Sequence, residues 1–257
     1  MEKNTSNYLK YAIGEIVLVV IGILIALQAN NWNIERNNSK QEKNILLQLE
    51  DEYLENLKEV EQKILLRNSS NSSIIKLIAY GEIGIQGISL DTIRKHITQT
   101  YLNITFDGAS GVTSVLLNSG SLNLLKNQEL KNHLSNWSGT SEKMIEEEQF
   151  IVKNTLPAYF DYIRHHFDMM KMMSDQPRNF EVNTSYLKSN KAFDYSGGIR
   201  GRYDKKEFSK FLNDMVVSNF IITIHHRNRT TNNQAEALKT KIEQILEIIR
   251  QELKKKN

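Results

Sequence analysis

The sequence predicts an all-α protein with a single N-terminal transmembrane helix, a long amphipathic stalk helix and an extramembrane helical bundle. One apolar run near the start of the chain is long enough to cross a bilayer. Only two prolines, Pro157 and Pro177, interrupt the 257 residues. Elsewhere the hydrophobic residues recur at spacings of three, four and seven, which is typical of amphipathic helices.

The predicted transmembrane helix covers residues 11–29, YAIGEIVLVVIGILIALQA, and contains one charged residue, Glu15. Its 19 residues make a helix of about 28 Å, close to the ~30 Å hydrocarbon core of a bilayer. Trp32 follows the run at the position of an interfacial aromatic anchor. A cleavable signal peptide is the competing interpretation, with Lys3 and Lys10 as its basic region.

One face of this helix carries small and polar residues within about 40° of a single line, at 100° per residue. Gly22 and Ala26 form a small-xxx-small pair, which lets another helix approach closely in lipid, so we expect self-association through this face. An ordinary lipid-facing anchor is the alternative. The stripe consists of Glu15, Val19, Gly22, Ala26, Ala29 and Asn33.

Glu15 is the unusual residue of the stripe, because a carboxylate within a membrane helix is costly and marks a partner, a water-filled path or a proton site by default. It lies about one turn inside the run, so it can also reach the headgroups or pair with Lys10 or Tyr11. Local pairing, contact with a partner helix and ion or proton conduction all stay open.

Residues 10–33, KYAIGEIVLVVIGILIALQANNWN, resemble the opening of a family of bacterial single-span membrane proteins of unknown function. Residues 119–125, SGSLNLL, with the following Glu129-Leu130, are similar to that family's helical core. The resemblance implies an inner-membrane anchor, a short cytoplasmic tail at residues 1–10 and a main domain in the periplasm. It implies no activity and supplies no catalytic residue.

The segment 30–67 is predicted to be a juxtamembrane stretch followed by the stalk helix, which starts near Ser39. The polar cluster at 68–73, NSSNSS, is predicted to end this helix and to start the bundle, which covers residues 68–257. The apolar face of the stalk is formed by Leu46, Leu49, Tyr53, Val60 and Ile64.

Short helices make up the first part of the predicted bundle. Glycines loosen the chain near residues 81–87 and 108–111, and Gly120 is predicted to stop a helix. The expected caps are Asp91, Asn127 and Thr140, and Pro157 should break or kink the helix that Thr140 opens.

The second part of the bundle begins with an irregular segment at residues 175–203, which contains Pro177 and a glycine pair. Asp204 with Glu207 predicts the start of a helix. Polar residues 227–234 are predicted to interrupt its apolar face, and residues 235–253 form an amphipathic helix that can pair with the stalk.

The stretch 165–173 is the one local group of side chains that suits a metal ion. Imidazoles bind copper or zinc and thioethers bind copper(I). Consecutive histidines point about 100° apart on a helix and methionines commonly fill core space, so we favour core packing over metal binding. The candidate ligands are His165, His166, Asp168, Met169 and Met172.

Recognisable catalytic motifs do not occur in the sequence: it has no nucleophile elbow, no phosphate loop and no His-Glu-x-x-His zinc motif. Its lack of cysteine excludes disulfides, thiolate metal sites and cysteine nucleophiles. The acidic run 146–148 is predicted to be a solvated helix face. We therefore expect neither catalysis nor a cofactor.

The net charge of +3 comes from 33 basic and 30 acidic residues, and the only sustained basic run is at 254–256, which argues against a nucleic-acid partner. Expected partners are the lipid bilayer and either further copies of the chain or another membrane protein. The sequence thus predicts a membrane-anchored helical scaffold or interaction protein, self-associating or an accessory subunit of an envelope complex. The alternative is a periplasmic ligand sensor or accessory subunit that couples a shift of the bundle to the membrane helix.

Overall fold

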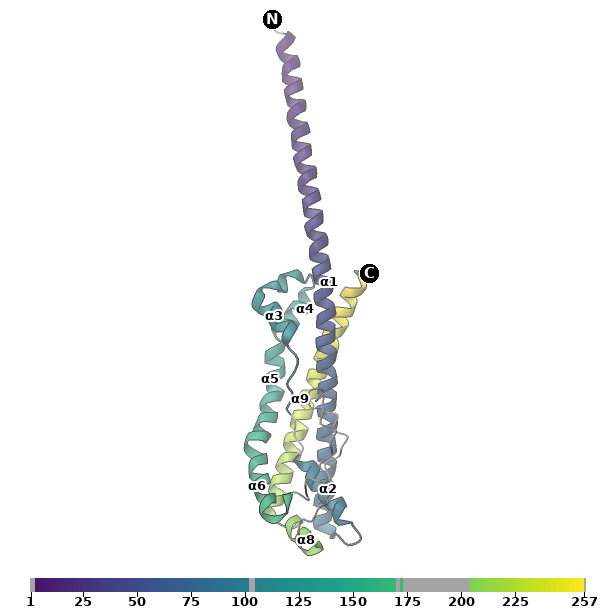
Figure 1. Cartoon of the computed structure of the whole chain (residues 1–257), viewed down its shortest axis with the longest axis vertical. Coiled ribbons are helices and arrows are strands. Elements are labelled where there is room, and N and C mark those ends of the chain that lie inside the picture. Colours follow the sequence, from purple (N-terminus) through teal and green to yellow (C-terminus); the bar gives the residue numbers. More distant parts are fainter. Residues whose placement is uncertain (1–2, 102–104, 170–171, 173–203, 257) are drawn as a thin grey trace. The chain divides into compact units, whose positions relative to one another are not determined.

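The computed structural model describes residues 3–101, 105–169, 172 and 204–256, and the surroundings of side chains from Gly14 onward (Figure 1). Every regular element in these residues is helical, which confirms the all-α prediction. The irregular segment predicted at 175–203 lies outside the described residues. The elements are α1 (Lys3–Ile83), α2 (Leu90–Thr100), α3 (Gly111–Ser119), the 3-10 turn η1 (Ser121–Leu124), α4 (Gln128–Ser135), α5 (Trp137–Phe150), the π-helical turn η2 (Ile151–Thr155), α6 (Leu156–His166), α8 (Lys205–Leu212) and α9 (Met215–Lys254).

The chain forms two compact units, each assembled from separate stretches of sequence. The first unit comprises Met1–Tyr53, Ser110–Ser135 and Ile245–Asn257. The second unit comprises Leu54–Ala109 and Asn136–Gln244. Each unit therefore contains part of α1 and part of α9.

The prediction that α1 ends at the polar cluster 68–73 is wrong, because the helix continues to Ile83. Two serines of the cluster are buried and hydrogen-bonded: Ser73 bonds to Gln99 and His96, and the Oγ of Ser70 accepts from Asn228 Nδ2 at 3.3 Å. These partners satisfy the serine hydroxyls, which otherwise compete with the helix backbone.

The predicted stalk is a core-lining helix from Leu46 onward. All five of its predicted apolar residues, from Leu46 to Ile64, are buried, which confirms the amphipathic face. In the second unit α9 lies alongside α1 (Figure 1), and Lys239 Nζ contacts Glu61 Oε1 across the pair at 2.7 Å. The structure thus confirms that the C-terminal amphipathic segment pairs with this part of α1.

Polar residues 227–234 interrupt the apolar face as predicted, but the helix α9 continues through them without a break. Asn228 and Thr231 are buried, and Asn232 accepts a hydrogen bond from Arg67 of α1 at 2.5 Å. Because polar residues of α1 face polar residues of α9, both helices continue through a polar layer of the second unit.

The core of the second unit is a cluster of aliphatic and aromatic side chains from α1, α2, α6, α8 and α9. Tyr159 is fully buried, and its hydroxyl accepts from Thr100 Oγ1 at 3.1 Å. The ring of Phe167 stacks on that of Phe208 with centroids 4.8 Å apart. These contacts join α6 to α2 and the segment after α6 to α8.

Several predicted helix ends are confirmed. Gly120 follows α3 with a φ of 71°, Asn127 Oδ1 accepts from Leu130 N–H at 2.9 Å, and Asp204 accepts from Glu207 N–H at 2.8 Å. Pro157 lies in the first turn of α6, directly after η2, as its missing N–H requires.

Two predicted helix starts are wrong. Ser89, rather than Asp91, caps α2, since its hydroxyl accepts from Thr92 N–H at 3.1 Å. Thr140 lies inside α5, which begins at Trp137 after a short break at the end of α4. Neighbouring cap-forming residues compete, and local sequence alone does not rank them.

Candidate functional site

The apolar part of α1 is a candidate membrane span. Among the helices that the structure describes, α1 alone has the length and composition to cross a bilayer, and none of its apolar window is buried. Leu18 is 71% exposed and Ile25 is 64% exposed. Each such side chain gains roughly 1.5–3 kcal/mol on leaving water, so this surface favours lipid or protein over solvent.

The small-residue stripe lies open on this helix. Glu15, Gly22, Ala26 and Ala29 are all exposed. Within the described part of the chain, a Cβ added at Gly22 would meet no atom within 4 Å. The space beside Gly22 is therefore available to a second helix.

Trp32, the predicted interface anchor, is 63% exposed and lies on α1 beyond the apolar run. The guanidinium of Arg36, one turn later, lies 5.7 Å from the centroid of its ring. A cation held over an indole suits the membrane–water boundary, where one side of the ring meets apolar chains and the other meets water.

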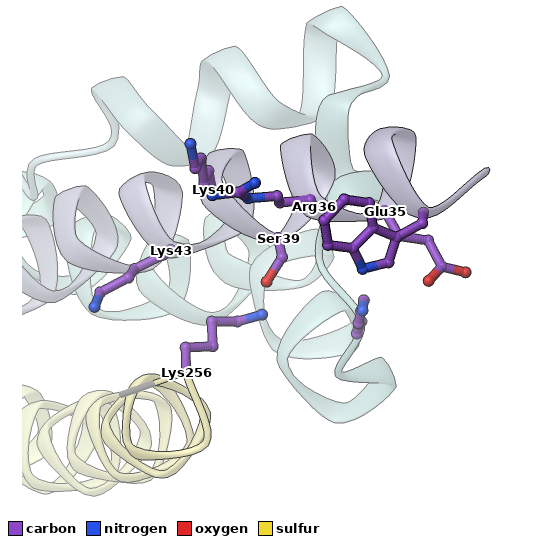
Figure 2. A pocket seen from close by; sticks show the side chains of 8 residues that line it. Glu35, Arg36, Ser39, Lys40, Lys43 and Lys256 are labelled. Carbon is purple, nitrogen blue, oxygen red and sulfur yellow. The ribbon is translucent and has the colours of Figure 1, made fainter. Parts of the chain in front are cut away.

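A pocket of about 520 Å³ lies next to Trp32, and five basic side chains line it (Figure 2). All of its residues belong to the first unit. Figure 2 shows Ser39 of α1 and Lys256 of the C-terminal end pointing toward one another. The pocket is lined by Trp32, Glu35, Arg36, Ser39, Lys40, Lys43, Lys126 and Lys256.

Glu42 holds the distant parts of this pocket together. Its carboxylate is 1% exposed, accepts from the backbone N–H of Lys126 at 2.7 Å and receives the Lys256 ammonium at 2.5 Å. A buried carboxylate needs such donors, so Glu42 places both the segment before α4 and the C-terminal end against α1.

A second carboxylate, Glu252, supports the same arrangement. It accepts from Asn127 Nδ2 at 2.8 Å and from Lys255 Nζ at 2.7 Å. The hydrogen bonds from Lys255 and then Asn127 lower the pKa of Glu252, so it is ionised at neutral pH. Asn127 thereby joins α9 to α4 while it caps α4.

Glu52 positions α3 in the first unit through hydrogen bonds. Its carboxylate accepts from Val112 N–H at 2.6 Å, Thr113 N–H at 3.1 Å and Thr113 Oγ1 at 2.5 Å. These N–H groups belong to the first turn of α3, which has no intrahelical acceptor for them. The negative charge also complements the positive end of the helix dipole.

An ion pair lies in the polar layer of the second unit. Arg67 Nη1 donates to Glu148 Oε1 at 2.5 Å, and the two side chains are 4% and 1% exposed. Glu148 Oε2 also accepts from Phe106 N–H at 2.6 Å. Glu148 thus binds α1 and the loop before α3 to α5.

Burial dominates the electrostatics of this pair. It raises the pKa of Glu148, while the Phe106 N–H and the Arg67 charge oppose the rise. It lowers the pKa of Arg67, while the charge of Glu148 opposes the fall. Since an arginine stays protonated near neutral pH, Glu148 supplies the compensating charge.

The prediction that residues 146–148 form a solvated face is wrong for Glu148. A signal for its burial exists in the sequence. Buried residues of this stretch recur at alternating spacings of four and three, which marks one helix face. They are Trp137, Ser141, Met144, Glu148, Ile151 and Thr155.

The structure does not bring the candidate metal ligands together. His165 and His166 are exposed at the end of α6, and each Nδ1 lies 2.7–2.8 Å from a backbone carbonyl one turn earlier. Met172 is fully buried in the hydrophobic core, while Asp168 and Met169 are half-buried after the helix. Within the described residues, no three His, Asp or Glu side chains are placed to hold a metal ion.

Sequence reasoning missed the basic pocket, because Lys126 and Lys256 are far in the chain from residues 32–43. The sequence shows the basic run 254–256, but the residues around this run do not indicate which other segments of the chain lie beside it. Comparisons with protein-family models, curated proteins and solved structures found no match. The family resemblance therefore stays a prediction.

Proposed function

We propose that this protein is a membrane-anchored helical scaffold that associates with further copies of itself through the apolar part of α1. The anchor, residues 11–29, crosses the bacterial inner membrane, with residues 1–10 in the cytoplasm and the chain from residue 30 onward in the periplasm. The anchor holds the helical bundle at the membrane surface, where the bundle contacts its partners.

The open stripe at Gly22 and Ala26 is the observation that supports self-association. Lipid chains are as apolar as the leucines and isoleucines of α1, so burial of apolar surface does not by itself drive helices together. Close backbone approach does, and Gly22 leaves room for it.

Glu15 strengthens this assignment because it lies on the same line as Gly22, seven residues earlier. In a monomer its carboxylate faces acyl chains or reaches for the headgroups. In a dimer the close contact at Gly22 places it beside the partner helix, where polar groups can satisfy it. The assembly therefore lowers the cost of an intramembrane carboxylate.

Gly22→Ile tests the interface. The full chain is extracted in mild detergent, and its mass is measured by light scattering over a range of protein concentrations. We expect a wild-type oligomer and at least about tenfold weaker association of the variant, since the branched side chain prevents close approach.

Gly14→Ile is the matched control. Gly14 also has open space around an added Cβ within the described residues, and it lies about 80° from Gly22 around the helix. The control should keep the wild-type mass. A monomeric wild type would refute self-association, and equal effects of the two variants would refute the assignment to this face.

The absence of cysteine from the chain allows a clean test of orientation. Single variants Thr5→Cys and Lys205→Cys are labelled in cells whose outer membrane is permeabilised, with a maleimide that does not cross the inner membrane. Lys205 is exposed at the start of α8. Labelling at 205 and protection at 5 is the expected result, and the reverse pattern would refute a periplasmic location of the chain that follows the anchor.

A further inference from the structure

We propose that the basic pocket of the first unit binds the headgroup phosphate of an anionic phospholipid. This inference rests on the proposed membrane anchoring but not on self-association. The occupant is a lipid of the same membrane that holds α1, in the leaflet that borders Trp32.

The position of the pocket along α1 supports a lipid as its ligand. The backbone positions of Trp32, Arg36 and Lys40 lie about 4.5, 10.5 and 16.5 Å beyond that of Ala29, at 1.5 Å per residue. The headgroup region extends roughly 5–8 Å outside the hydrocarbon core. Arg36 therefore lies near the outer edge of the headgroups, and Lys40 lies within about one Debye length of them.

The charge of the pocket favours an anion. Its lining contains five basic side chains and one carboxylate, Glu35. Beneath the lining, Glu42 is committed to Lys256 through the contact at 2.5 Å. The remaining positive charge comes from α1 and from Lys126, which lies 84 residues after Glu42, so the folded unit creates a concentration of charge that the linear sequence lacks.

The donors also suit a phosphate. Arg36 can present two parallel N–H groups to phosphate oxygens, and the lysines add point charges around them. Ser39 and Lys256, which face one another in Figure 2, place a hydroxyl and an ammonium on opposite sides of the gap. The exposed ring of Trp32 borders the apolar run, where the glycerol backbone and acyl chains of a lipid begin.

Retention of lipid by the full chain is the test. The protein is placed in phosphatidylcholine nanodiscs that also contain phosphatidylglycerol, and bound lipids are counted by native mass spectrometry after release. The variant combines Lys40→Gln with Lys126→Gln, two exposed positions in the lining. Since each basic residue near an anionic surface contributes about fivefold, we expect at least about tenfold less bound phosphatidylglycerol.

The control combines Lys205→Gln with Lys206→Gln, which removes the same charge from exposed positions outside the pocket. It should retain phosphatidylglycerol as the wild type does. Equal loss from both variants, or equal retention of phosphatidylcholine and phosphatidylglycerol by the wild type, would overturn the proposal.

A competition arm separates a lipid from a soluble anion. Glycerol 3-phosphate, which carries the phosphate without acyl chains, should displace phosphatidylglycerol poorly. Displacement at concentrations equal to those of the lipid would assign the pocket to a soluble anion and overturn the lipid proposal. Failure of the chain to enter nanodiscs would instead refute the anchoring, so the two proposals fail separately.

Discussion

Glu148→Gln should destabilise the second unit strongly although it changes few atoms. The variant keeps an acceptor for Phe106 N–H but removes the charge that compensates Arg67. Both side chains of the pair are almost fully buried, so water cannot replace the lost partner. Removing one partner of a buried pair costs about 3–5 kcal/mol, and the retained acceptor places this variant near the lower value.

Urea unfolding of the full chain in mild detergent measures this loss. Trp137 is buried on α5, the helix that carries Glu148, and reports on the second unit. A Trp32→Phe background removes the other tryptophan, which lies in the first unit. With a denaturant slope of about 2 kcal/mol per M, a loss of about 3 kcal/mol lowers the midpoint by roughly 1.5 M urea.

Glu147→Gln is the adjacent control, because Glu147 pairs with Arg227 at 2.9 Å in a partly exposed position. It should cost less than about 1 kcal/mol. Adding Arg67→Met to Glu148→Gln should recover stability, since no uncompensated charge then remains. If Glu148→Gln costs no more than the control, or if the double variant is the less stable one, the reasoning about a buried pair is refuted.

Two further predictions use the same unfolding assay. Burial lowers the pKa of His96; the charges of Lys76 and Lys95 act in the same direction, and a hydrogen bond to Gln99 opposes them. The folded protein therefore holds a neutral imidazole, whereas the unfolded chain protonates it near pH 6.5. The free energy of unfolding should consequently fall as the pH drops below about 6.5. His96→Gln should flatten this pH profile, and a profile identical to wild type would exclude His96 as a cause. Gly108 has a φ of 45°, and a Cβ there would lie 2.6 Å from Cε1 of Phe106, so Gly108→Ala should cost about 2–4 kcal/mol. Gly84→Ala, with a φ of 84° and no atom of the described chain within 4 Å of its Cβ, should cost only about 1 kcal/mol, and equal costs would show that the Phe106 contact is unimportant.

The elements that could be predicted are those whose cause is local. Gly120 and Asp204 mark helix ends because a left-handed residue or a capping carboxylate acts on its immediate neighbours. The disturbance at Pro157 follows in the same way from one missing N–H. The sequence does not decide between adjacent capping residues such as Ser89 and Asp91, because either side chain can accept a hydrogen bond from a backbone N–H at the start of a helix.

The sequence-based predictions that are wrong concern polar residues within helices. Residues 68–73 and 227–234 have turn-like composition, yet both stretches are helical. Their side chains meet one another and Arg67 in the second unit, which removes the reason to leave the helix. The prediction that Glu148 is exposed to solvent is wrong for a similar reason, because its sequence neighbours are acidic while its partner, Arg67, is 81 residues away.

By itself, the sequence determined the apolar helix that is long enough to span a membrane, its small-residue stripe and the amphipathic faces, because hydrophobicity and helical period are properties of consecutive residues. The tertiary structure alone decided which charged side chains are buried and which gather at the basic pocket. Glu42, Lys126 and Lys256 acquire their roles only when chain segments more than eighty residues apart come together. Whether a charge meets water or a partner depends on that arrangement, and the energy difference is large enough to override local preference.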